Sequence, residues 1–324
     1  IPEKETEEKE LSKEATEEKD TEGEIMLTLE EKPEFLRQEY RYGDIALFHV
    51  TSYLKRVQTK LFKVDLLEAA HLDKCLILNN RLKLAKIDEH VFYETLVHPA
   101  MCLHPRPVSV LLLGGGGGGA LREILRHRLV EKVIMLERDL PLLELCKKDL
   151  LFLELEESLA DPRVELVTDE DPVEYLNNLE EKFDVVIFDL NEPVSDQPSD
   201  DFLNMDFYKL IESKTKNLGI MVTPSCPIYH PFDENPSHRL VLGFMKELFP
   251  RVYGFLEYLT SHHALYGFIM GSRTFSPASI NREEIDRRLA ERNVKHLKYY
   301  VGYAHQRLFS LPVAMRQALE NPEI

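Results

Sequence analysis

The feature that most constrains this chain is an unbroken run of six glycines, residues 114–119. It follows an apolar segment, residues 108–113, and precedes residues 120–127, whose apolar side chains recur at helical spacing. Glycine has no Cβ, so its backbone adopts positive φ values and approaches a ligand closely. A buried strand, a glycine-rich turn and a helix N-terminus form the nucleotide site of doubly wound sheets. Because a flexible linker would have polar neighbours, the run predicts a ligand-binding turn.

The residues after the glycines alternate between predicted strands and helices. Strands are expected at 132–136, 164–167, 183–188, 219–223, 252–256 and 265–270, and helices at 140–150, 172–179, 202–216 and 239–249. Alternation of this kind, with continuously apolar strands, indicates a mostly parallel sheet covered by helices on both faces. We therefore predict an α/β fold built on a Rossmann-like, methyltransferase-type doubly wound sheet.

The residues before the glycines have a different pattern. Short β-prone runs are expected at 25–29, 42–50, 59–64, 74–78 and 82–87, with a turn at 79–81 and a helix at 88–98. Such a pattern is typical of a small antiparallel β-sheet domain. The sequence His104-Pro105-Arg106-Pro107 then breaks the helix and marks the boundary to the next domain.

The first residues of the chain are dominated by Glu, Lys and Thr. This segment has few apolar side chains, and burying them cannot offset the entropy lost on ordering. We therefore predict a disordered acidic tail, with a solvated single helix as the alternative. The predicted division is a tail at 1–24, a β domain with a linking helix at 25–104, and a nucleoside-binding catalytic domain at 105–324.

Composition limits the partners. The formal net charge of −17 argues against nucleic acid, whose phosphates would be repelled, and is compatible with cationic substrates. The four cysteines lack CxxC spacing, which favours buried thiols in a reducing compartment over a structural metal site. No apolar run reaches the roughly 18 residues of a membrane span. We expect a cytoplasmic protein with a small-molecule substrate and no metal.

Carboxylates follow three of the predicted parallel strands, at the edge where such sheets bind ligands. Glu137 comes about twenty residues after the glycines, where an acidic side chain accepts hydrogen bonds from ribose hydroxyls. Asp171 follows the next strand and is placed to reach an adenine amino group. Asp189 and Glu192 follow the strand after that, and two carboxylates three residues apart suit an amine or its proton. Solvated loop acids are the alternative for each.

Two other classes of site have less support. Six glycines match the GxGxxG pattern of NAD-binding proteins trivially, and nothing downstream resembles a nicotinamide substrate site. No GxSxG elbow is present, and Ser225 and Cys226 lie between prolines without a recognisable base nearby.

From about residue 30 onward the chain resembles the polyamine aminopropyltransferases, the spermidine synthase family. The matching motifs are Asp88-Glu89 with Glu94, Pro105-Arg106-Pro107, 110–122, Glu137 with Asp139, 183–189, Phe207-Tyr208, 297–300, Ala304-His305 and 309–312. The resemblance implies transfer of propylamine from decarboxylated S-adenosylmethionine to an amine, leaving methylthioadenosine. It also implies a homo-oligomer, a dimer or a tetramer.

The resemblance assigns a role to each acidic candidate. Gly114, Gly115, Gly116 and Gly117 would hold the adenosyl thioether. Glu137 would bind the ribose and Asp171 the adenine. Asp189 would be the base and amine anchor, with Glu192 in place of a second aspartate.

Several positions depart from the family pattern on the amine side. The family's aspartate within the glycine loop, which holds the aminopropyl amine, falls at Gly117. A family glutamine falls at Lys83, and a family tyrosine falls at Phe92, two residues before the retained Glu94. A second glutamine falls at Pro224, and a Tyr-Pro pair that lines the acceptor channel falls at Ser261-His262. The resemblance therefore implies a retained adenosine side and a largely replaced polyamine side.

Three functional hypotheses follow. The first is an active aminopropyltransferase with an altered amine acceptor. The second is a catalytically inactive relative that acts as a binding or assembly subunit. The third is a methyltransferase that uses S-adenosylmethionine itself, with Lys83 pairing with the donor carboxylate.

Overall fold

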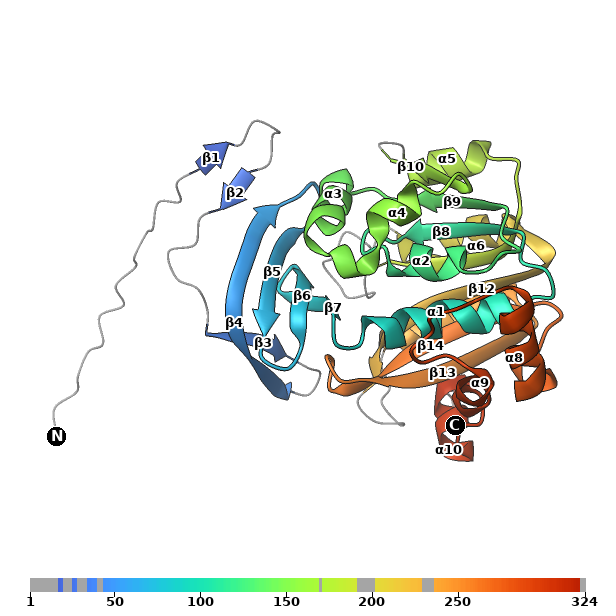
Figure 1. Ribbon diagram of the computed structural model, residues 1–324. Coiled ribbons are helices and arrows are strands. Elements are labelled where there is room, and N and C mark those ends of the chain that lie inside the picture. The colour runs from blue at the N-terminus through green and yellow to red at the C-terminus, as the bar shows by residue number, and fades with distance from the viewer. Residues whose placement is uncertain are drawn as a thin grey trace.

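The computed structural model of the protein contains two β-sheets, one formed by the N-terminal third of the chain and one by the remainder (Figure 1). It describes residues 17–19, 25–27, 34–39, 43–168, 171–190, 202–228 and 236–320. The predicted Glu192 and most of the predicted tail, 1–24, lie outside these residues. Within that tail segment Glu17–Lys19 forms strand β1, contrary to the expectation of disorder for these three residues.

The larger sheet has the strand order β10-β9-β8-β11-β12-β14-β13. Its strands are β8 Ser109–Gly114, β9 Lys132–Leu136, β10 Val164–Val167, β11 Phe183–Asp189, β12 Thr215–Ile228, β13 Arg251–Leu259 and β14 Ala264–Ser272. Neighbours from β10 to β12 pair in parallel, and β14 is antiparallel to both β12 and β13. Chain order reverses direction at β8, so this is a doubly wound sheet with its switch point beside the glycine run. The predicted α/β class is confirmed.

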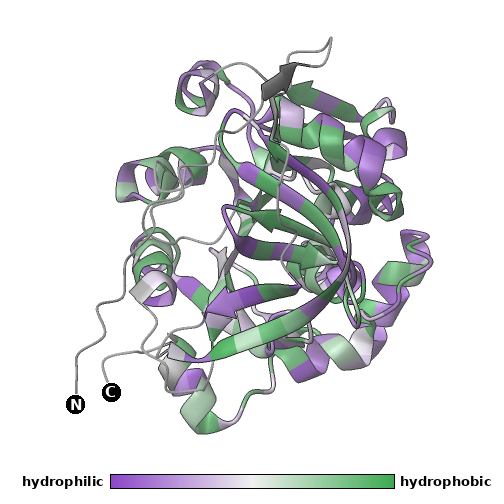
Figure 2. Ribbon diagram, turned by 90° about the vertical axis from the view of Figure 1, so that its left-hand side faces the viewer, coloured by the Kyte–Doolittle hydropathy of each residue, from purple (hydrophilic) through white to green (hydrophobic). Residues whose placement is uncertain are grey.

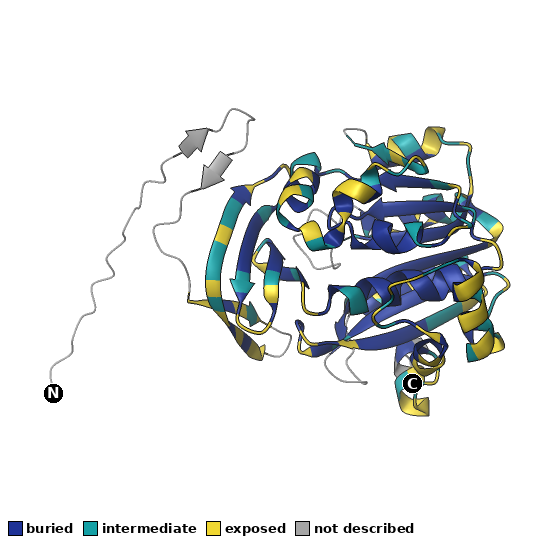
Figure 3. Cartoon of the chain, viewed as in Figure 1, coloured by how far each residue is buried: buried dark blue, intermediate teal, exposed yellow. Residues whose placement is uncertain are grey.

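Helices cover both faces of this sheet because its strands are apolar on both sides. Along β8, Val110 and Leu112 belong to one buried cluster, whereas Leu111 and Leu113 belong to another. The first cluster includes side chains of α1 Glu89–Leu103, α2 Gly119–Leu125, α3 Leu140–Asp149, α4 Leu155–Leu159, α8 Arg282–Glu291 and α9 Gly302–Leu308. The second includes side chains of α5 Pro172–Asn178, α6 Met205–Ser213 and α7 Pro236–Leu248. Figure 3 shows the strands buried between these layers.

The N-terminal sheet is antiparallel, as predicted. Its strands are β1, β2 Ile25–Leu27, β3 Phe35–Glu39, β4 Ile45–Gln58, β5 Lys63–Ala69, β6 Asp73–Leu78 and β7 Arg81–Ala85, in the order β1-β2-β4-β5-β6-β7 with β3 paired to β4. The predicted turn at Asn79 and Asn80 is present, with φ values of 49° and 65°. Hydrophilic and hydrophobic residues mix along β4 to β7, which face the viewer in Figure 2. Side chains of β4 to β7 that face the larger sheet join its first buried cluster.

Several elements differ from their sequence-based bounds, and β5 begins at Lys63, near the end of the strand expected at 59–64. Strand β4 runs to Gln58, past the predicted end at 50, because β5 pairs with this added length. Strand β12 begins at Thr215, inside the predicted helix 202–216, since Thr215 pairs with Phe183 of β11. Tertiary pairing overrides helix propensity in this segment. Helix α1 continues through Pro99 to Leu103 rather than ending at 98.

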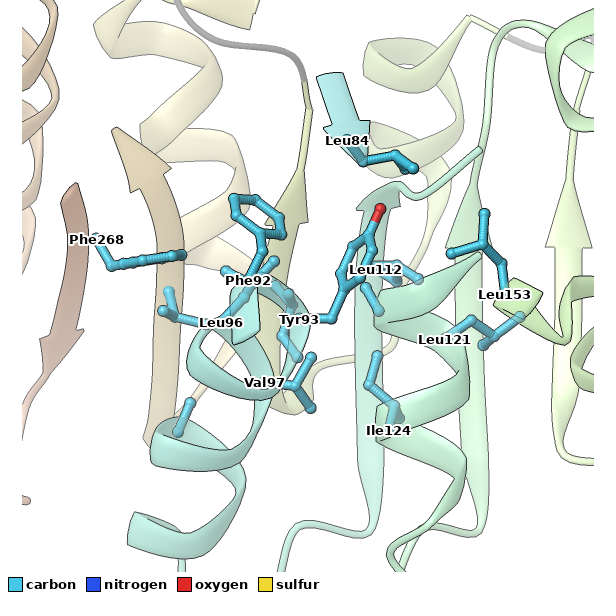
Figure 4. Packing of buried hydrophobic residues seen from close by; sticks show 14 of the residues in the cluster. Leu84, Phe92, Tyr93, Leu96, Val97, Leu112, Leu121, Ile124, Leu153 and Phe268 are labelled. Atoms are coloured by element: carbon cyan, nitrogen blue, oxygen red, sulfur yellow. The ribbon is translucent and has the colours of Figure 1, made fainter. Parts of the chain in front are cut away.

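Helices α1 and α2 pack closely (Figure 4). A Cβ on Gly119 would lie 2.1 Å from the Tyr93 ring, so the last glycine of the run is needed for this contact. Buried polar side chains also join the pair. His98 of α1 hydrogen-bonds to Glu123 of α2 at 3.1 Å, and Arg122 bridges Glu123 and Glu89 at 2.8 Å each.

A side chain from the C-terminal region contacts the C-terminal end of α1. Arg292, which follows α8, donates to the main-chain carbonyls of Met101, His104 and Pro105 at 2.5, 2.9 and 3.1 Å. Its side chain is buried, with 3% of the residue exposed. These carbonyls have no intrahelical partner at a helix end, and a cation there also suits the helix dipole. The rest of the C-terminal region is the 3₁₀ turn Pro277–Ser279 and α10 Val313–Glu320.

Two properties of the described residues bear on earlier expectations. None of their helices is both long and apolar enough to cross a membrane. Within the same part of the chain, no three His, Cys, Asp or Glu side chains are grouped so as to hold a metal ion.

We predict that Arg292→Met lowers the free energy of unfolding by about 2–4 kcal/mol, because it leaves buried carbonyls without a donor. Urea denaturation followed by circular dichroism measures the change. The matched control is Arg287→Met, on the exposed side of α8, which should leave the urea midpoint within error. Equal midpoints for the two variants would contradict the role given to Arg292.

Candidate functional site

A cavity lies where the carboxyl ends of β8, β9 and β11 meet the N-terminal sheet, with about 720 Å³ of space that includes some open to solvent. Its lining residues come from both sheets and from α3, α5 and α6: Leu61, Phe62, Leu76, Leu78, Lys83, Leu113, Gly114, Gly116, Gly117, Leu136, Glu137, Arg138, Leu142, Pro172, Asp189, Leu190, Phe202 and Phe207. A concave, mostly apolar wall with a few convergent polar groups is typical of a small-molecule site.

The glycine run takes a conformation that other residues adopt only with strain. Gly114, Gly115 and Gly118 have φ values of 78°, 102° and 79°. A Cβ on Gly114 would lie 2.7 Å from the carbonyl oxygen of Asp189. The predicted glycine turn is therefore present, and it brings Gly114 and Asp189 side by side.

Glu137 is buried at the end of β9, directly across from the turn. Its two carboxylate oxygens accept hydrogen bonds from the backbone N–H groups of Gly116 (2.8 Å) and Asp139 (2.9 Å). Burial raises the pKa of Glu137 to about 7, against the lowering effect of the Asp139 backbone hydrogen bond. Each oxygen retains a lone pair for a ligand hydroxyl. This arrangement suits the ribose role expected for Glu137.

Asp189 ends β11 on the opposite side of the glycine turn. Its Oδ1 accepts a hydrogen bond from Lys83 Nζ at 3.1 Å, and its side chain has no exposed surface. Its Oδ2 is buried without a hydrogen-bond partner among the described residues. Burial raises the pKa of Asp189, whereas the Lys83 ammonium acts to lower it. The site thus contains a buried carboxylate with one oxygen hydrogen-bonded to Lys83 and the other without a partner among the described residues.

Lys83 brings a positive charge from β7 into this cavity. Besides Asp189, its Nζ donates to the carbonyl of Leu190 at 3.3 Å and lies 5.7 Å from the centre of the Phe92 ring. The expectation that Lys83 belongs to the site agrees with its place in the cavity wall. Phe92 lies behind it, with its ring edge-on to Tyr93 and Tyr266.

Tyr93 was not expected from sequence to belong to the site. A Cβ on Gly117 would lie 2.7 Å from the Tyr93 hydroxyl, so this phenol occupies the space that a side chain at 117 would need. The hydroxyl is fully buried and has no hydrogen-bond partner in the part of the chain that the structure describes. Figure 4 shows it directed away from the helix pair, toward Leu84. No local pattern identifies such a residue, because it depends on how α1 packs against the glycine turn.

Two predicted site residues accept hydrogen bonds from backbone N–H groups and lie outside the cavity wall. Asp171 is exposed, is absent from the cavity wall, and caps α5 by accepting from the N–H groups of Val173 (2.9 Å) and Glu174 (3.0 Å). An Asp followed by Pro and, three residues on, by Glu is a helix-start signal that sequence reasoning missed. Glu94 is buried outside the cavity wall and accepts from three successive backbone N–H groups, those of residues 298–300.

The remaining substrate-side candidates lie outside the cavity wall. Pro224 is in β12 at an irregularity of its pairing with β14. Ser261 is in the turn between β13 and β14, where its N–H donates to Asp88 at 2.8 Å.

Asp139 connects the cavity's two walls. It caps α3 by accepting from Leu142 at 3.1 Å, and its other oxygen accepts from Thr59 (2.5 Å) and from the backbone of Leu61 (3.2 Å). Leu61 itself lines the cavity.

Comparisons with known proteins agree with this geometry. A family model described as the spermine/spermidine synthase domain matches residues 89–280. Polyamine aminopropyltransferase 2 of Hyperthermus butylicus is 31% identical over 280 residues, covering 86% of this chain and 90% of that protein. The polyamine aminopropyltransferase of Thermococcus onnurineus is 33% identical over 277 residues, covering 85% and 92%.

Solved structures are similar over nearly the whole chain. A spermidine synthase in complex with the transition-state analogue AdoDATO has a TM-score of 0.77 and 25% identity, covering 96% of this chain and 98% of that one. The spermidine synthase of Thermotoga maritima has a TM-score of 0.74 and 25% identity, covering 88% and 94%.

We predict that the affinity for methylthioadenosine rises by up to about tenfold between pH 6 and pH 8. Ribose hydroxyls donate to the ionised Glu137, and below its pKa of about 7 the protonated form must first lose its proton. Calorimetric titration measures the affinity at each pH. The Glu137→Gln variant should bind methylthioadenosine more weakly, with an affinity that does not change with pH. The Glu144→Gln variant, at an exposed position, should show the same rise in affinity as the unmodified protein. A flat profile in the unmodified protein would contradict the prediction.

We predict that Tyr93→Phe raises the free energy of unfolding of the ligand-free protein by about 1 kcal/mol, because it removes a buried hydroxyl that lacks a partner. Urea denaturation tests this. A loss of stability would mean that the hydroxyl has a hydrogen bond in solution.

Proposed function

Because the chain belongs to the spermine/spermidine synthase family, whose curated relatives are polyamine aminopropyltransferases, we propose that it transfers an amine-bearing alkyl chain from an adenosyl sulfonium to an amine acceptor. The observation that carries the proposal is the pairing, in one cavity, of the Gly116–Glu137 contact with the unpartnered oxygen of Asp189. The first group suits a ribose, and the second suits an amine that must lose a proton.

Each group has a defined task in this reaction. Glu137 and the glycine turn bind the nucleoside. Asp189 accepts a proton from the acceptor ammonium through Oδ2, which frees the nitrogen lone pair for attack on the carbon bonded to sulfur. The carbon–sulfur bond breaks with its electron pair on sulfur, so that the cationic sulfonium leaves as neutral methylthioadenosine. Lys83 holds Oδ1 and favours the ionised carboxylate that a base requires.

The residues present fit an adenosyl donor. Asp189, in the cavity wall, and Tyr93, beside Gly117, each have a side-chain oxygen that is buried without a protein partner among the described residues. Such atoms are costly unless a ligand or water pairs with them. The donor implied by the family resemblance is decarboxylated S-adenosylmethionine. The polyamine side is altered, so the proposed acceptor differs from the usual one.

A second candidate function is ligand binding or assembly without turnover. The Lys83–Asp189 ion pair favours it, because the lysine ammonium already occupies one oxygen of the carboxylate that an acceptor amine would use. The third candidate, methyl transfer, differs in its product, which is S-adenosylhomocysteine instead of methylthioadenosine. We also propose that the protein is cytoplasmic and forms a homo-oligomer, a dimer or a tetramer. Light scattering of the purified protein tests the oligomeric state.

We predict that the protein releases methylthioadenosine from an adenosyl sulfonium donor when supplied with amines, and that Asp189→Asn lowers the rate at least a hundredfold. Liquid chromatography of the nucleoside products measures the rate. The control is Asp206→Asn on the exposed first turn of α6, which should retain full activity.

Absence of methylthioadenosine with every donor and amine, from a folded protein that binds the nucleoside, would refute turnover and support the binding role. Release of S-adenosylhomocysteine would instead identify a methyltransferase.

A further inference from the structure

One end of the cavity contains both a lysine ammonium, that of Lys83, and the buried carboxylate of Asp189. Lys83 Nζ has three N–H groups and donates to two protein acceptors, Asp189 Oδ1 and the Leu190 carbonyl. The third N–H has no acceptor among the described residues, on a side chain that is only 14% exposed. A nearly buried ammonium with a donor to spare attracts an anion.

No second carboxylate is available at this end among the residues that line the cavity near Lys83. At Gly117, where the family resemblance places an aspartate that holds the donor amine, the space for a side chain is filled by the neutral Tyr93 hydroxyl. Asp189 is already paired with Lys83. Among the described residues, a donor tail that carries only an ammonium would thus meet a neutral phenol, a lysine cation and a carboxylate that is paired with that lysine.

A tail that carries both charges fits these groups better. An α-carboxylate pairs with the spare N–H of Lys83, and an α-ammonium donates to the oxygen of Tyr93, which lacks a partner. Asp189 Oδ2 then remains free for the acceptor amine, as the proposed function requires. The spare N–H of Lys83, the Tyr93 oxygen and Asp189 Oδ2 would each then have a partner of complementary polarity.

We propose that the donor is S-adenosylmethionine with its carboxylate intact, and that the group transferred is the 3-amino-3-carboxypropyl chain. This inference rests on the proposed function and specifies its donor. The acceptor nitrogen forms a bond to the γ-carbon of the methionine chain, the bond from that carbon to sulfur breaks, and its electron pair stays on sulfur. The acceptor's proton passes to Asp189, and the second product is methylthioadenosine. Lys83 determines specificity by binding the donor carboxylate.

Calorimetric titration of the full-length protein with S-adenosylmethionine and with its decarboxylated form tests donor selection without an acceptor. The expected result is at least tenfold tighter binding of the carboxylated donor. Lys83→Gln, which removes the charge and restores the residue type implied by the resemblance, should weaken S-adenosylmethionine at least tenfold and leave the decarboxylated donor unchanged or tighter. The control is Lys86→Gln, an exposed lysine paired with Asp73, which should keep the original preference.

Product analysis with putrescine, spermidine and longer diamines completes the test. Methylthioadenosine from S-adenosylmethionine, with an acceptor heavier by one aminocarboxypropyl group, supports the inference. Equal or tighter binding of the decarboxylated donor, or an unchanged preference in Lys83→Gln, overturns it. If only decarboxylated donor yields methylthioadenosine, the inference fails while the proposed function stands. If neither donor yields it, both fail.

Discussion

The close approach of two parallel strand ends is the constraint on which the site depends. Gly114 of β8 pairs with Asp189 of β11, and any Cβ at position 114 would collide with the Asp189 carbonyl. Only glycine permits this spacing, at a positive φ that costs it little. The consequence is that the backbone amides of the turn and a buried carboxylate face the same cavity. Gly116 then lies within reach of Glu137, so that Glu137 and Asp189 share one edge of the sheet.

The N-terminal sheet contributes charge as well as a wall. Lys83 reaches across from β7 to Asp189, and the Asp139 carboxylate holds the turn between β4 and β5 against α3. A buried carboxylate without a cation would favour its neutral form. Lys83 opposes that shift and also occupies one oxygen, so the same contact supports Asp189 as a base and restricts which ligands can approach it.

Local patterns predicted much of the larger sheet. Strands β9 and β10 coincide with their predicted bounds, and the strand–glycine–helix unit was identified from apolar periodicity and the lack of Cβ atoms. Strands β4 and β12, whose bounds were among those misjudged, owe their length to pairing with other strands, which a sequence window does not contain. Asp171, expected at the ligand from its place after a strand, also caps α5, as its neighbours Pro172 and Glu174 indicate.

What the sequence by itself determined is the doubly wound sheet, the glycine turn and the positions of Glu137 and Asp189 at strand ends, because these follow from continuously apolar runs and from backbone sterics. The family resemblance added the expectation that Gly117 and Lys83 alter the amine side. Only the tertiary structure decided what those changes mean. It placed the Lys83 ammonium on Asp189 and the Tyr93 hydroxyl in the space beside Gly117, and it turned Glu94 toward the backbone of residues 298–300. Such contacts join residues far apart in the chain, and their energies depend on burial and charge pairing, which exist only after the two sheets have packed together.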